Sequence, residues 1–251
     1  MKNLFDLTGK VAVVTGASGG LGAGMSVGLA EAGADLLLVD RRGSPETSKR
    51  VTETGRRAAT LVADLQDPEA PERIISEAVR EYGRVDIVVN NAGIIRRTPA
   101  LDFTPQDWDD VMFINSRAVF FMCQAAGRRM VKQGKGKIIN VASLLSFQGG
   151  IIVPSYAASK GAVAQITKSL ANEWAPLGVN VNAIAPGYMA TDNTKALRED
   201  AARSRAILER IPAGRWGTPD DLQGAAVFLA SAASDYLNGH VLVVDGGWMA
   251  R

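Results

Sequence analysis

The sequence contains very little cysteine or histidine. Cys123 is the only cysteine and His240 the only histidine among the 251 residues. A lone cysteine excludes an intramolecular disulfide and a metal site built from several cysteines, and the apolar run around Cys123 favours burial. Since no second cysteine or histidine lies near His240, no metal site is expected. A reducing compartment, and hence the cytoplasm, is the expected location.

The sequence also lacks an excess of charge of one sign and any long hydrophobic run. It has 28 basic and 26 acidic residues, and the basic ones are scattered, so electrostatics gives no case for a nucleic-acid partner. No segment reaches the about 20 apolar residues that a membrane-spanning helix needs. The basic segment 132–137 is interrupted by glycine and is expected to form a solvated loop before a strand.

Short apolar runs alternate with longer segments of helical spacing along the whole chain. The runs have no polar alternation, which is typical of strands covered on both faces. The pattern predicts one α/β domain over residues 1–251, a Rossmann-type doubly wound parallel sheet of about seven strands with helices on both faces. The expected strands are Val11–Val14, Leu36–Val39, Ala59–Val62, Val85–Val89, Ile138–Val141, Val179–Ile184 and Val241–Val244. The expected helices include Pro68–Tyr82, Trp108–Lys132, Ser155–Trp174 and Pro219–Ser231.

Residues 188–217 fit this pattern least well. They combine methionine, threonine and asparagine with many charged residues. A segment of this length between regular elements is either a functional lid or a plain surface excursion, and both interpretations stay open here.

A glycine-rich turn follows the first expected strand directly. It runs from Thr15 to Gly22 with the sequence Thr-Gly-Ala-Ser-Gly-Gly-Leu-Gly, and a helix is expected to begin within it. Such a turn lets the backbone approach a pyrophosphate closely, and the free N–H groups of the new helix face the phosphates. No Lys-Ser or Lys-Thr pair follows, which disfavours a P-loop kinase or ATPase. The predicted phosphate-binding residues are Gly16, Ser18, Gly19, Gly20, Leu21 and Gly22.

Asp40 ends the second expected strand. A carboxylate at this point can accept hydrogen bonds from both ribose hydroxyls of NAD and would repel the 2′-phosphate of NADP. Arg41 and Arg42 follow at once and can attract that phosphate, so NADP remains possible. We favour NAD because Asp40 is nearer the strand end.

Tyr156 and Lys160 form a pair at the spacing i, i+4, which places them side by side on one helix face. An ammonium near a phenol is expected to lower the pKa of the phenol and make it a usable acid–base group. Ser143 follows the expected strand Ile138–Val141, at the sheet edge where ligands bind in open parallel sheets. Its hydroxyl can hydrogen-bond a substrate oxygen while Tyr156 exchanges the proton.

The joint pattern closely resembles the short-chain dehydrogenase/reductase family. The matching motifs are Thr15-Gly16-x-x-x-Gly20-x-Gly22, Asn90-Asn91-Ala92-Gly93, Asn115, Ser143, Tyr156-x-x-x-Lys160, Pro186-Gly187 and Val244-Asp245-Gly246-Gly247. The resemblance covers nearly the whole chain. It implies an NAD(P)-dependent oxidoreductase that acts on an alcohol or ketone.

The resemblance also implies roles for individual residues. Asn115, Ser143, Tyr156 and Lys160 would be catalytic, with Asn115 fixing a water beside Lys160 and Ser143 orienting the substrate carbonyl. Further cofactor contacts are implied for Arg41, Asp64, Leu65, Asn91, Ala92, Gly93, Pro186, Gly187, Met189 and Thr191. From the residues alone, Asn115 is a polar residue inside a helix and Asp64 a turn former.

Several segments resemble a narrower group of this family, the dehydrogenases of deoxygluconate-type sugar acids, which act in the breakdown of pectin-derived uronates. Gluconate 5-dehydrogenases and other polyol or ketone reductases share much of the pattern. A sugar acid requires a cation for its carboxylate and polar groups for its hydroxyls, so Arg96 or Arg97, and Gln148, are candidate substrate residues. Both arginines are equally compatible with a solvated loop.

Two other classes and the oligomeric state complete the expectations. A dinucleotide-binding protein without catalysis has no need for the serine, tyrosine and lysine together, and an epimerase or dehydratase usually carries a longer substrate lobe. The family resemblance suggests a homotetramer. Trp248 and Met249 near the C-terminus either pack at a subunit contact or cover their own domain.

Overall fold

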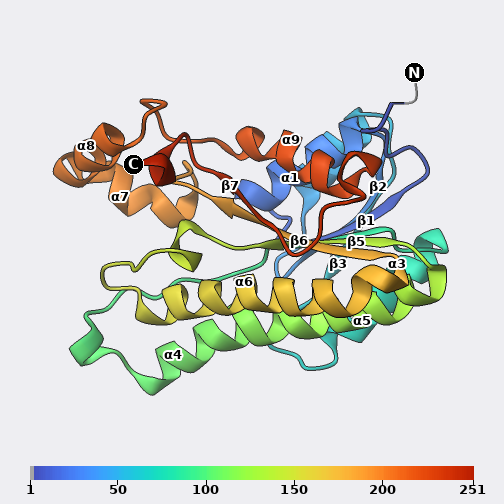
Figure 1. The fold of residues 1–251 in the computed structure, drawn as a ribbon, viewed down its shortest axis with the longest axis horizontal. Coiled ribbons are helices and arrows are strands. Elements are labelled where there is room, and N and C mark those ends of the chain that lie inside the picture. Colours follow the sequence, from blue (N-terminus) through green and yellow to red (C-terminus); the bar gives the residue numbers. More distant parts are fainter. Residues whose placement is uncertain (1–2) are drawn as a thin grey trace.

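The computed structural model describes residues 3–251 and is built around one seven-stranded, wholly parallel sheet (Figure 1). The strand order is β3-β2-β1-β4-β5-β6-β7. The strands are β1 (Val11–Thr15), β2 (Asp35–Asp40), β3 (Ala58–Val62), β4 (Ile87–Asn90), β5 (Gly136–Val141), β6 (Val179–Pro186) and β7 (Val241–Val244). This confirms the predicted doubly wound α/β fold, and each expected strand is present.

Helices cover both faces of the sheet, as Figure 1 shows with α5 and α6 below the sheet and α1 and α9 above it. One core contains side chains of α3 (Ala70–Tyr82), α5 (Ala118–Gln133) and α6 (Pro154–Trp174). The other contains side chains of α1 (Gly20–Glu31), α2 (Pro45–Glu53) and α9 (Gln223–Ala230). Cys123 is buried in the first core, as its apolar neighbours predicted. No helix in residues 3–251 is long and apolar enough to cross a membrane.

The order of connections reverses beside β1. This strand pairs with β2 on one side and with β4 on the other, so the chain crosses over between β3 and β4. The loops at the carboxyl ends of β1 and β4 therefore diverge to opposite faces and leave a crevice between them, which is where ligands bind in open α/β sheets. The glycine turn follows β1 and Asn91 follows β4, so both lie at this point.

The expected helix Trp108–Lys132 is wrong as a single element. The structure has α4 (Pro105–Met112), a π turn at Phe113–Arg117, and then α5. The Thr104 side chain begins α4 by accepting a hydrogen bond from the backbone N–H of Asp107. Hydrophobic periodicity does not reveal a π turn, because one widened turn barely changes which face is apolar.

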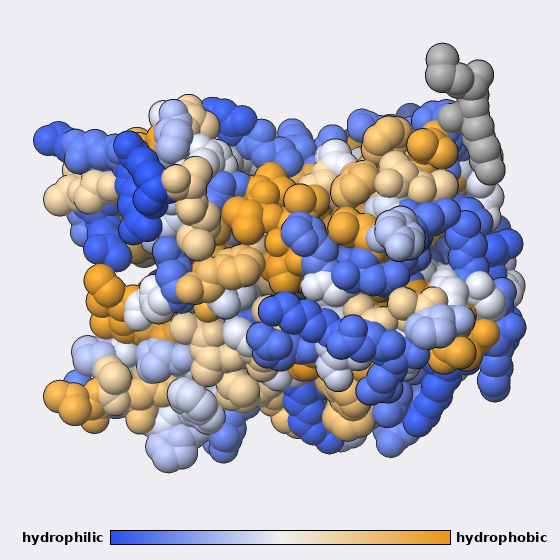
Figure 2. All heavy atoms as spheres, in the orientation of Figure 1, coloured by the Kyte–Doolittle hydropathy of each residue, from blue (hydrophilic) through white to orange (hydrophobic). Residues whose placement is uncertain are grey.

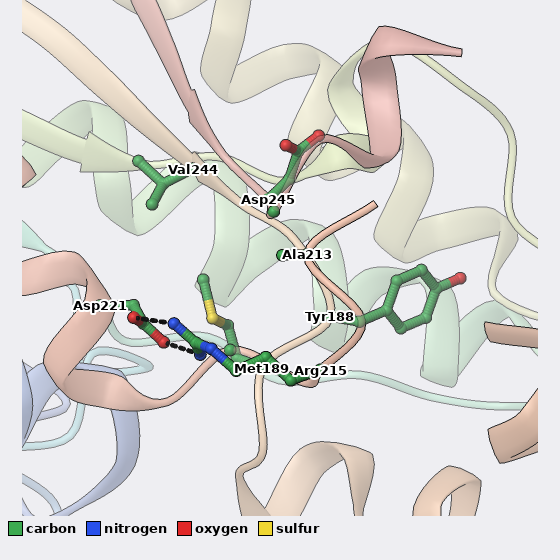
Figure 3. Close-up of a pocket in the computed structure, with 9 residues that line it drawn as sticks. Tyr188, Met189, Ala213, Arg215, Asp221, Val244 and Asp245 are labelled. Atoms are coloured by element: carbon green, nitrogen blue, oxygen red, sulfur yellow. Dashed lines mark hydrogen bonds and ion pairs between the residues drawn. The ribbon is translucent and has the colours of Figure 1, made fainter. Parts of the chain in front are cut away.

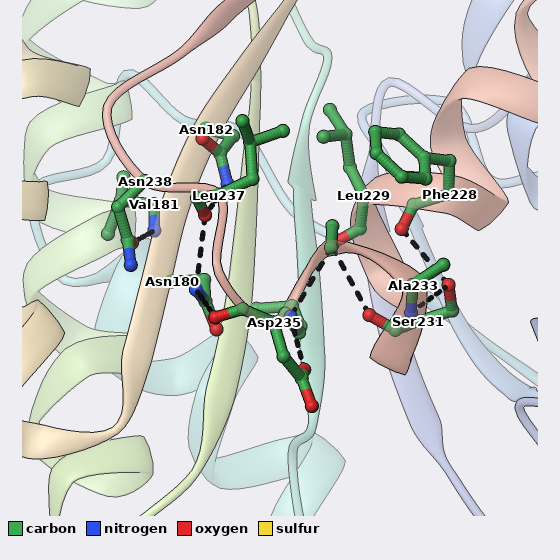
Figure 4. A network of polar contacts seen from close by, with 12 residues as sticks. Asn180, Val181, Asn182, Phe228, Leu229, Ser231, Ala233, Asp235, Leu237 and Asn238 are labelled. Atoms are coloured by element: carbon green, nitrogen blue, oxygen red, sulfur yellow. Dashed lines mark hydrogen bonds and ion pairs between the residues drawn. The ribbon is translucent and has the colours of Figure 1, made fainter. Parts of the chain in front are cut away.

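The segment 132–137 is also not a solvated loop throughout. Lys137 lies within β5, its side chain is 4% exposed, and its Nζ lies 2.8 Å from the Oδ1 of Asp235. Next to it, the side chains of Asn180 and Asn182 donate to the carbonyl oxygen of Leu237 (Figure 4). These contacts tie the amino ends of β5 and β6 to the connection before β7.

Residues 188–217 form a small lobe over the carboxyl ends of the last strands. The lobe contains α7 (Lys195–Glu199) and α8 (Ala201–Arg210), and the surface is indented beneath it at the left of Figure 2. Ile207 and Ile211 pack with Trp248, which is 5% exposed. Trp248 therefore covers its own domain, whereas Met249 is 37% exposed, and a subunit contact for it stays a prediction. Whether the lobe moves as a lid stays a prediction.

Candidate active site

The glycine turn has a backbone that side chains would obstruct. Gly16 and Gly20 adopt φ values of +66° and +53°, which favour glycine. A Cβ atom on Gly22 would lie 2.2 Å from the carbonyl oxygen of Gly16, so α1 packs against the turn only because Gly22 has no side chain. The Asn91 amide nitrogen donates to the carbonyl oxygens of Thr15 and Gly16, both at 3.0 Å. The end of β4 thus fixes the turn after β1.

A cleft runs along this edge of the sheet and has two adjoining parts that share residues around Gly16 and Asp40. The part between the turn and α6 is lined by Gly16, Ser18, Gly19, Gly20, Leu21, Asp40, Arg42, Asn91, Ala92, Gly93, Val141, Tyr156, Lys160, Thr191, Asp192 and Asn193. The part toward β3 is lined by Thr15, Gly16, Val39, Asp40, Arg41, Arg42, Ala63, Asp64, Leu65, Gln66, Ala92, Gly93, Ile94, Arg96 and Ile114. Most of the predicted cofactor residues therefore lie together.

Sequence reasoning missed Asp192 and Asn193 of this lining. Of the two arginines considered for a phosphate, Arg42 borders both parts of the cleft, whereas Arg41 borders only the part toward β3. Asp192 and Asn193, from the lobe, border the part near α6. Their position next to Thr191, a predicted contact, was the one available signal.

Asp40 is held in place by backbone groups. Its Oδ2 accepts from the backbone N–H of Ser18 at 3.3 Å and its Oδ1 from that of Arg42 at 3.0 Å. The carboxylate thus lies between the glycine turn and the following loop, at the end of β2 as expected. Asp40 can accept hydrogen bonds from the two hydroxyls of a ribose, and Arg42 can bind a phosphate.

Tyr156 and Lys160 lie one turn apart near the start of α6, and both line the cleft. Lys160 is buried, and its Nζ donates to the carbonyl oxygen of Val141 at 2.6 Å. The same nitrogen is 5.6 Å from the centre of the Tyr156 ring. The ammonium therefore lies between the end of β5 and the phenol.

Burial shifts the pKa values of both groups toward their neutral forms. It raises the pKa of Tyr156, and a hydrogen bond with Ser143 and the charge of Arg97 oppose this rise. Burial lowers the pKa of Lys160 from 10.5 to about 8. The expectation that Lys160 lowers the pKa of Tyr156 is wrong for this structure, because desolvation of the phenol is the larger effect and the opposing charge is that of Arg97.

The turn that carries Ser143 is fastened to α6. The Ser143 Oγ accepts from the backbone N–H of Leu145 at 3.2 Å. The Ser146 Oγ donates to the carbonyl oxygen of Lys160 at 2.7 Å. Ser143, Tyr156 and Lys160 are therefore brought together, and Ser146 is a positioning residue that the sequence analysis did not identify.

Asn115 lies in the π turn and connects two loops of the site. Its Oδ1 accepts from the backbone N–H of Ile94 at 2.8 Å. Its Nδ2 donates to the carbonyl oxygen of Ile94 at 2.9 Å and to the Ser159 Oγ at 3.2 Å. The side chain thus holds the loop after β4 against α6, and its predicted role with a water stays a prediction.

Four predicted cofactor residues are not in the lining of the cleft: Gly22, which packs against the turn, and Pro186, Gly187 and Met189. Pro186 ends β6, and a Cβ atom on Gly187 would lie 2.6 Å from the Cα of Asp245, so this glycine allows the ends of β6 and β7 to approach. Met189 is 5% exposed and lines a separate pocket near the paired side chains of Arg215 and Asp221 (Figure 3). A nicotinamide contact for Pro186, Gly187 and Met189 is not visible in the geometry.

The two candidate arginines differ in their partners. Arg96 forms ion pairs with Asp107 at 3.1 Å and Asp110 at 3.4 Å. Arg97 donates to the carbonyl oxygen of Asn193 at 2.8 Å, and within residues 3–251 it has no carboxylate partner. As a substrate cation Arg96 is therefore disfavoured, because its charge is already compensated by α4.

Several known proteins are similar to this chain in sequence and structure over nearly its whole length. A family model described as enoyl-(acyl carrier protein) reductase matches residues 16–249. The 2-dehydro-3-deoxy-D-gluconate 5-dehydrogenase of Dickeya dadantii is 60% identical over 250 residues, which are 99% of each chain. A chain from Agrobacterium tumefaciens solved with bound NADP is 55% identical, covers 100% of both chains and has a TM-score of 0.95.

A gluconate 5-dehydrogenase from Burkholderia cenocepacia, solved in complex with NADP and tartrate, is also similar. It is 43% identical, with 99% of this chain and 98% of that chain covered and a TM-score of 0.94. The matched regions span 98% or more of this chain and of each relative. The chain belongs to the short-chain dehydrogenase/reductase family, as the order of its motifs implied.

Proposed function

We propose that the protein transfers hydride between a nicotinamide dinucleotide and a hydroxyl or ketone group of a sugar acid, as a 2-dehydro-3-deoxy-D-gluconate 5-dehydrogenase. The observation that carries this proposal is that Tyr156 and Lys160 line the same cleft as the glycine turn, with Ser143 next to the Tyr156 hydroxyl. The relative of that name, 60% identical over nearly all of both chains, supports the choice of substrate.

The cleft fits a dinucleotide on its own geometry. A Cβ atom on Gly19 would meet nothing within 4 Å, so the backbone there is open to a ligand, and the N-terminus of α1 faces the same space. Gly16, Ser18, Gly20 and Leu21 would hold the pyrophosphate, and Asp40 with Arg42 the adenosine ribose. The nicotinamide supplies or accepts the hydride.

The proton step is assigned to Tyr156. In reduction its O–H bond breaks as the proton passes to the carbonyl oxygen of the substrate, and in oxidation the phenolate takes the proton of the hydroxyl. Ser143, hydrogen-bonded with the same phenol, would hold the substrate oxygen in line. Lys160, buried with its Nζ 5.6 Å from the centre of the ring, would bind the nicotinamide ribose.

Replacement of Tyr156 tests the proton step. Tyr156→Phe keeps the ring and removes the hydroxyl, so kcat should fall by about 100- to 10,000-fold while the Kd for NADH stays within about twofold of wild type. Initial rates at 340 nm and NADH fluorescence titration measure the two quantities. Turnover that survives the substitution would refute the role of Tyr156.

Arg97 is the proposed partner of the substrate carboxylate. Its charge acts on the Tyr156 hydroxyl and carries no carboxylate partner in the part of the chain described, whereas Arg96 is neutralised by two aspartates. Arg97→Ala should raise KM for a sugar acid by about 10-fold or more and leave KM for a neutral polyol nearly unchanged. Arg96→Ala is the matched control, and equal effects of the two substitutions would end this assignment.

Gluconate 5-dehydrogenase is the second candidate function. The similar Burkholderia enzyme of that name, solved with the diacid tartrate, favours it. A panel of sugar acids and polyols assayed with NAD and NADP separates the candidates by kcat/KM. Net and sustained NAD(P)H production also excludes a cofactor-recycling epimerase and a non-catalytic binding protein.

The cofactor preference is proposed to be NAD, on the position of Asp40. The relatives solved with NADP and the Arg42 side chain beside Asp40 argue for NADP. Asp40→Ala should lower kcat/KM with NAD by about 10-fold and raise the NADP/NAD ratio. An unchanged ratio would defeat the preference for NAD.

A homotetramer in the cytoplasm is proposed on the family resemblance, with a role in the breakdown of pectin-derived uronates. The buried and unpaired Cys123 is compatible with a reducing compartment. Light scattering coupled to gel filtration should give about four times the 26.5 kDa mass of the chain. A monomeric mass would contradict the tetramer.

A further inference from the structure

The turn of residues 245–250, called the C-terminal turn, lies next to the lobe of residues 188–217. Asp245, directly after β7, accepts hydrogen bonds from the backbone N–H groups of Gly247 and Met249, both at 2.8 Å. These bonds fold the chain into a short helical turn, Trp248–Ala250. In Figure 1 this turn, in dark red, lies next to the lobe that carries α7 and α8.

Trp248 within this turn joins three segments that are far apart in the sequence. Its ring lies 4.5 Å from the ring of Tyr188, which follows β6. The guanidinium of Arg210, the last residue of α8, lies 4.0 Å above the Trp248 ring. The indole N–H donates to the Gln148 Oε1, at 3.4 Å, in the turn after β5. Trp248 therefore touches the turn after β5, the turn after β6 and the lobe at once.

The Gln148 contact links Trp248 to the reacting groups. The backbone N–H of Gln148 donates to the carbonyl oxygen of Leu144, next to Ser143, so the two residues share one compact turn. Ser143 is hydrogen-bonded with Tyr156. The Trp248 ring is 5% exposed, and a buried indole N–H without its acceptor is costly. A single hydrogen bond thus connects the C-terminal turn to the turn that positions the serine.

A second set of contacts holds α8 from the other side. The Arg251 side chain donates to the carbonyl oxygens of Arg210, at 3.1 Å, and Glu209. These carbonyls belong to the last turn of α8, where no intrahelical donor remains for them. The C-terminal residue and Trp248 therefore fasten the same helix end.

We propose that Trp248 is a positioning residue for the substrate. It holds the turn of residues 143–148 and the end of α8 in fixed positions relative to each other, and these two segments border the space that the substrate occupies. The inference rests on the proposed function, because it assumes that the substrate binds next to Ser143 and Tyr156. It does not require a particular sugar acid, because the contacts involve no substrate group.

Trp248→Phe tests the inference, because it keeps a ring for Tyr188 and Arg210 and removes the N–H. KM for the sugar acid should rise about 3- to 10-fold, as expected for one lost hydrogen bond, with the Kd for NADH unchanged. Gln148→Met removes the acceptor instead, on a half-buried side chain, and should raise KM at least as much even where the tryptophan variant folds poorly. Because Gln148 is also a candidate substrate residue, the double variant separates the two roles. The double variant should be no worse than Gln148→Met alone, because both substitutions remove the same hydrogen bond.

Trp174→Phe is the matched control, since this tryptophan packs against Gly127 at the other end of α6. Hydrogen exchange gives a readout that needs no substrate: residues 144–150 and 201–210 should exchange faster in Trp248→Phe than in wild type and the control. A wild type inactive on every sugar acid would refute the proposed function, and the exchange data would then decide on Trp248 alone. The inference would be overturned if Trp248→Phe left both KM for the sugar acid and hydrogen exchange unchanged. It would also be overturned if the effects of Trp248→Phe and Gln148→Met on KM added up in the double variant.

Discussion

At the scale of single residues, the acid–base pair is governed by burial. Tyr156 and Lys160 are each shifted toward the neutral form, the phenol to a higher pKa and the amine to about 8. At neutral pH the phenol therefore keeps its proton and is ready to protonate a carbonyl oxygen. The sequence predicted which residues form the pair but not the direction of the phenol shift, because that direction depends on desolvation, which only the packed structure determines.

The charge of Arg97 should be visible in the pH dependence of the reaction. Oxidation needs the phenolate, so kcat/KM for the alcohol should rise with pH until Tyr156 has lost its proton. Since the Arg97 charge lowers the pKa of Tyr156, Arg97→Gln should move this rise to higher pH. Arg96→Gln, with its charge already paired, should leave the profile in place; a profile that shifts equally in both variants would contradict the distinction.

Lys160 should make stability depend on pH in the alkaline range. The folded protein releases the Lys160 proton at about 8 and the unfolded chain near 10.5, so between these values the unfolded state binds more protons and stability rises with pH. Below pH 8 the folded protein carries the cost of a buried charge, and Lys160→Met removes it. Wild type should therefore gain free energy of unfolding relative to Lys160→Met between pH 7 and pH 9.5, measured by urea denaturation. A difference that does not change with pH would argue against the lowered pKa.

At the scale of elements, two local structures build the site, and they differ in how readily the sequence reveals them. The glycine turn was predictable, because glycines at this spacing directly after an apolar strand are typical of a phosphate-binding turn. The π turn at Phe113–Arg117 was not, and it is this turn that places Asn115 against Ile94. The pairing of Arg96 with Asp107 and Asp110 was equally hidden, since it depends on where α4 packs.

Two glycines of the same turn should respond differently to substitution. Gly22→Ala places a Cβ atom 2.2 Å from the Gly16 carbonyl oxygen and should lower the free energy of unfolding by about 2 kcal/mol and weaken NADH binding. Gly19→Ala is the matched control for stability, because its Cβ atom would lie in open space and its φ is −176°. Thermal unfolding of both variants gives the comparison. Equal losses of stability would show that the packing of α1 on the turn is not the cause.

At the scale of the whole molecule, the strands of the sheet were predicted from the sequence more fully than the site was. Seven apolar runs gave seven strands, because a strand covered on both faces has no polar positions to obscure it. The lobe of residues 188–217 and the C-terminal turn were harder to place, since their contacts join segments far apart in the sequence. Lys137 is the clearest miss: its charge indicated solvent, and its pairing with Asp235 allows burial.

A ligand that touches several elements of one sheet edge should stabilise the whole fold. The cleft takes residues from the ends of β1, β2 and β4 and from α6, so a dinucleotide is expected to bind only the folded chain. At about 100 times its Kd, NADH should add about 2.7 kcal/mol, or about 5 to 10 °C in Tm for a chain of this size. Differential scanning fluorimetry with NADH and NADPH at equal concentrations measures the shift. Absence of any shift with both would exclude the proposed cleft.

The network around Lys137, Asn180 and Asn182 lies at the amino ends of the strands, opposite the edge that carries Tyr156. The two edges of the sheet thus have different roles: polar contacts at the amino-end edge hold the connection before β7, and the carboxyl-end edge carries the candidate active site. Substitutions at the amino-end edge can therefore change the free energy of unfolding without changing kcat. Substitutions at the carboxyl-end edge can change the substrate preference while the contacts of Lys137, Asn180 and Asn182 are kept.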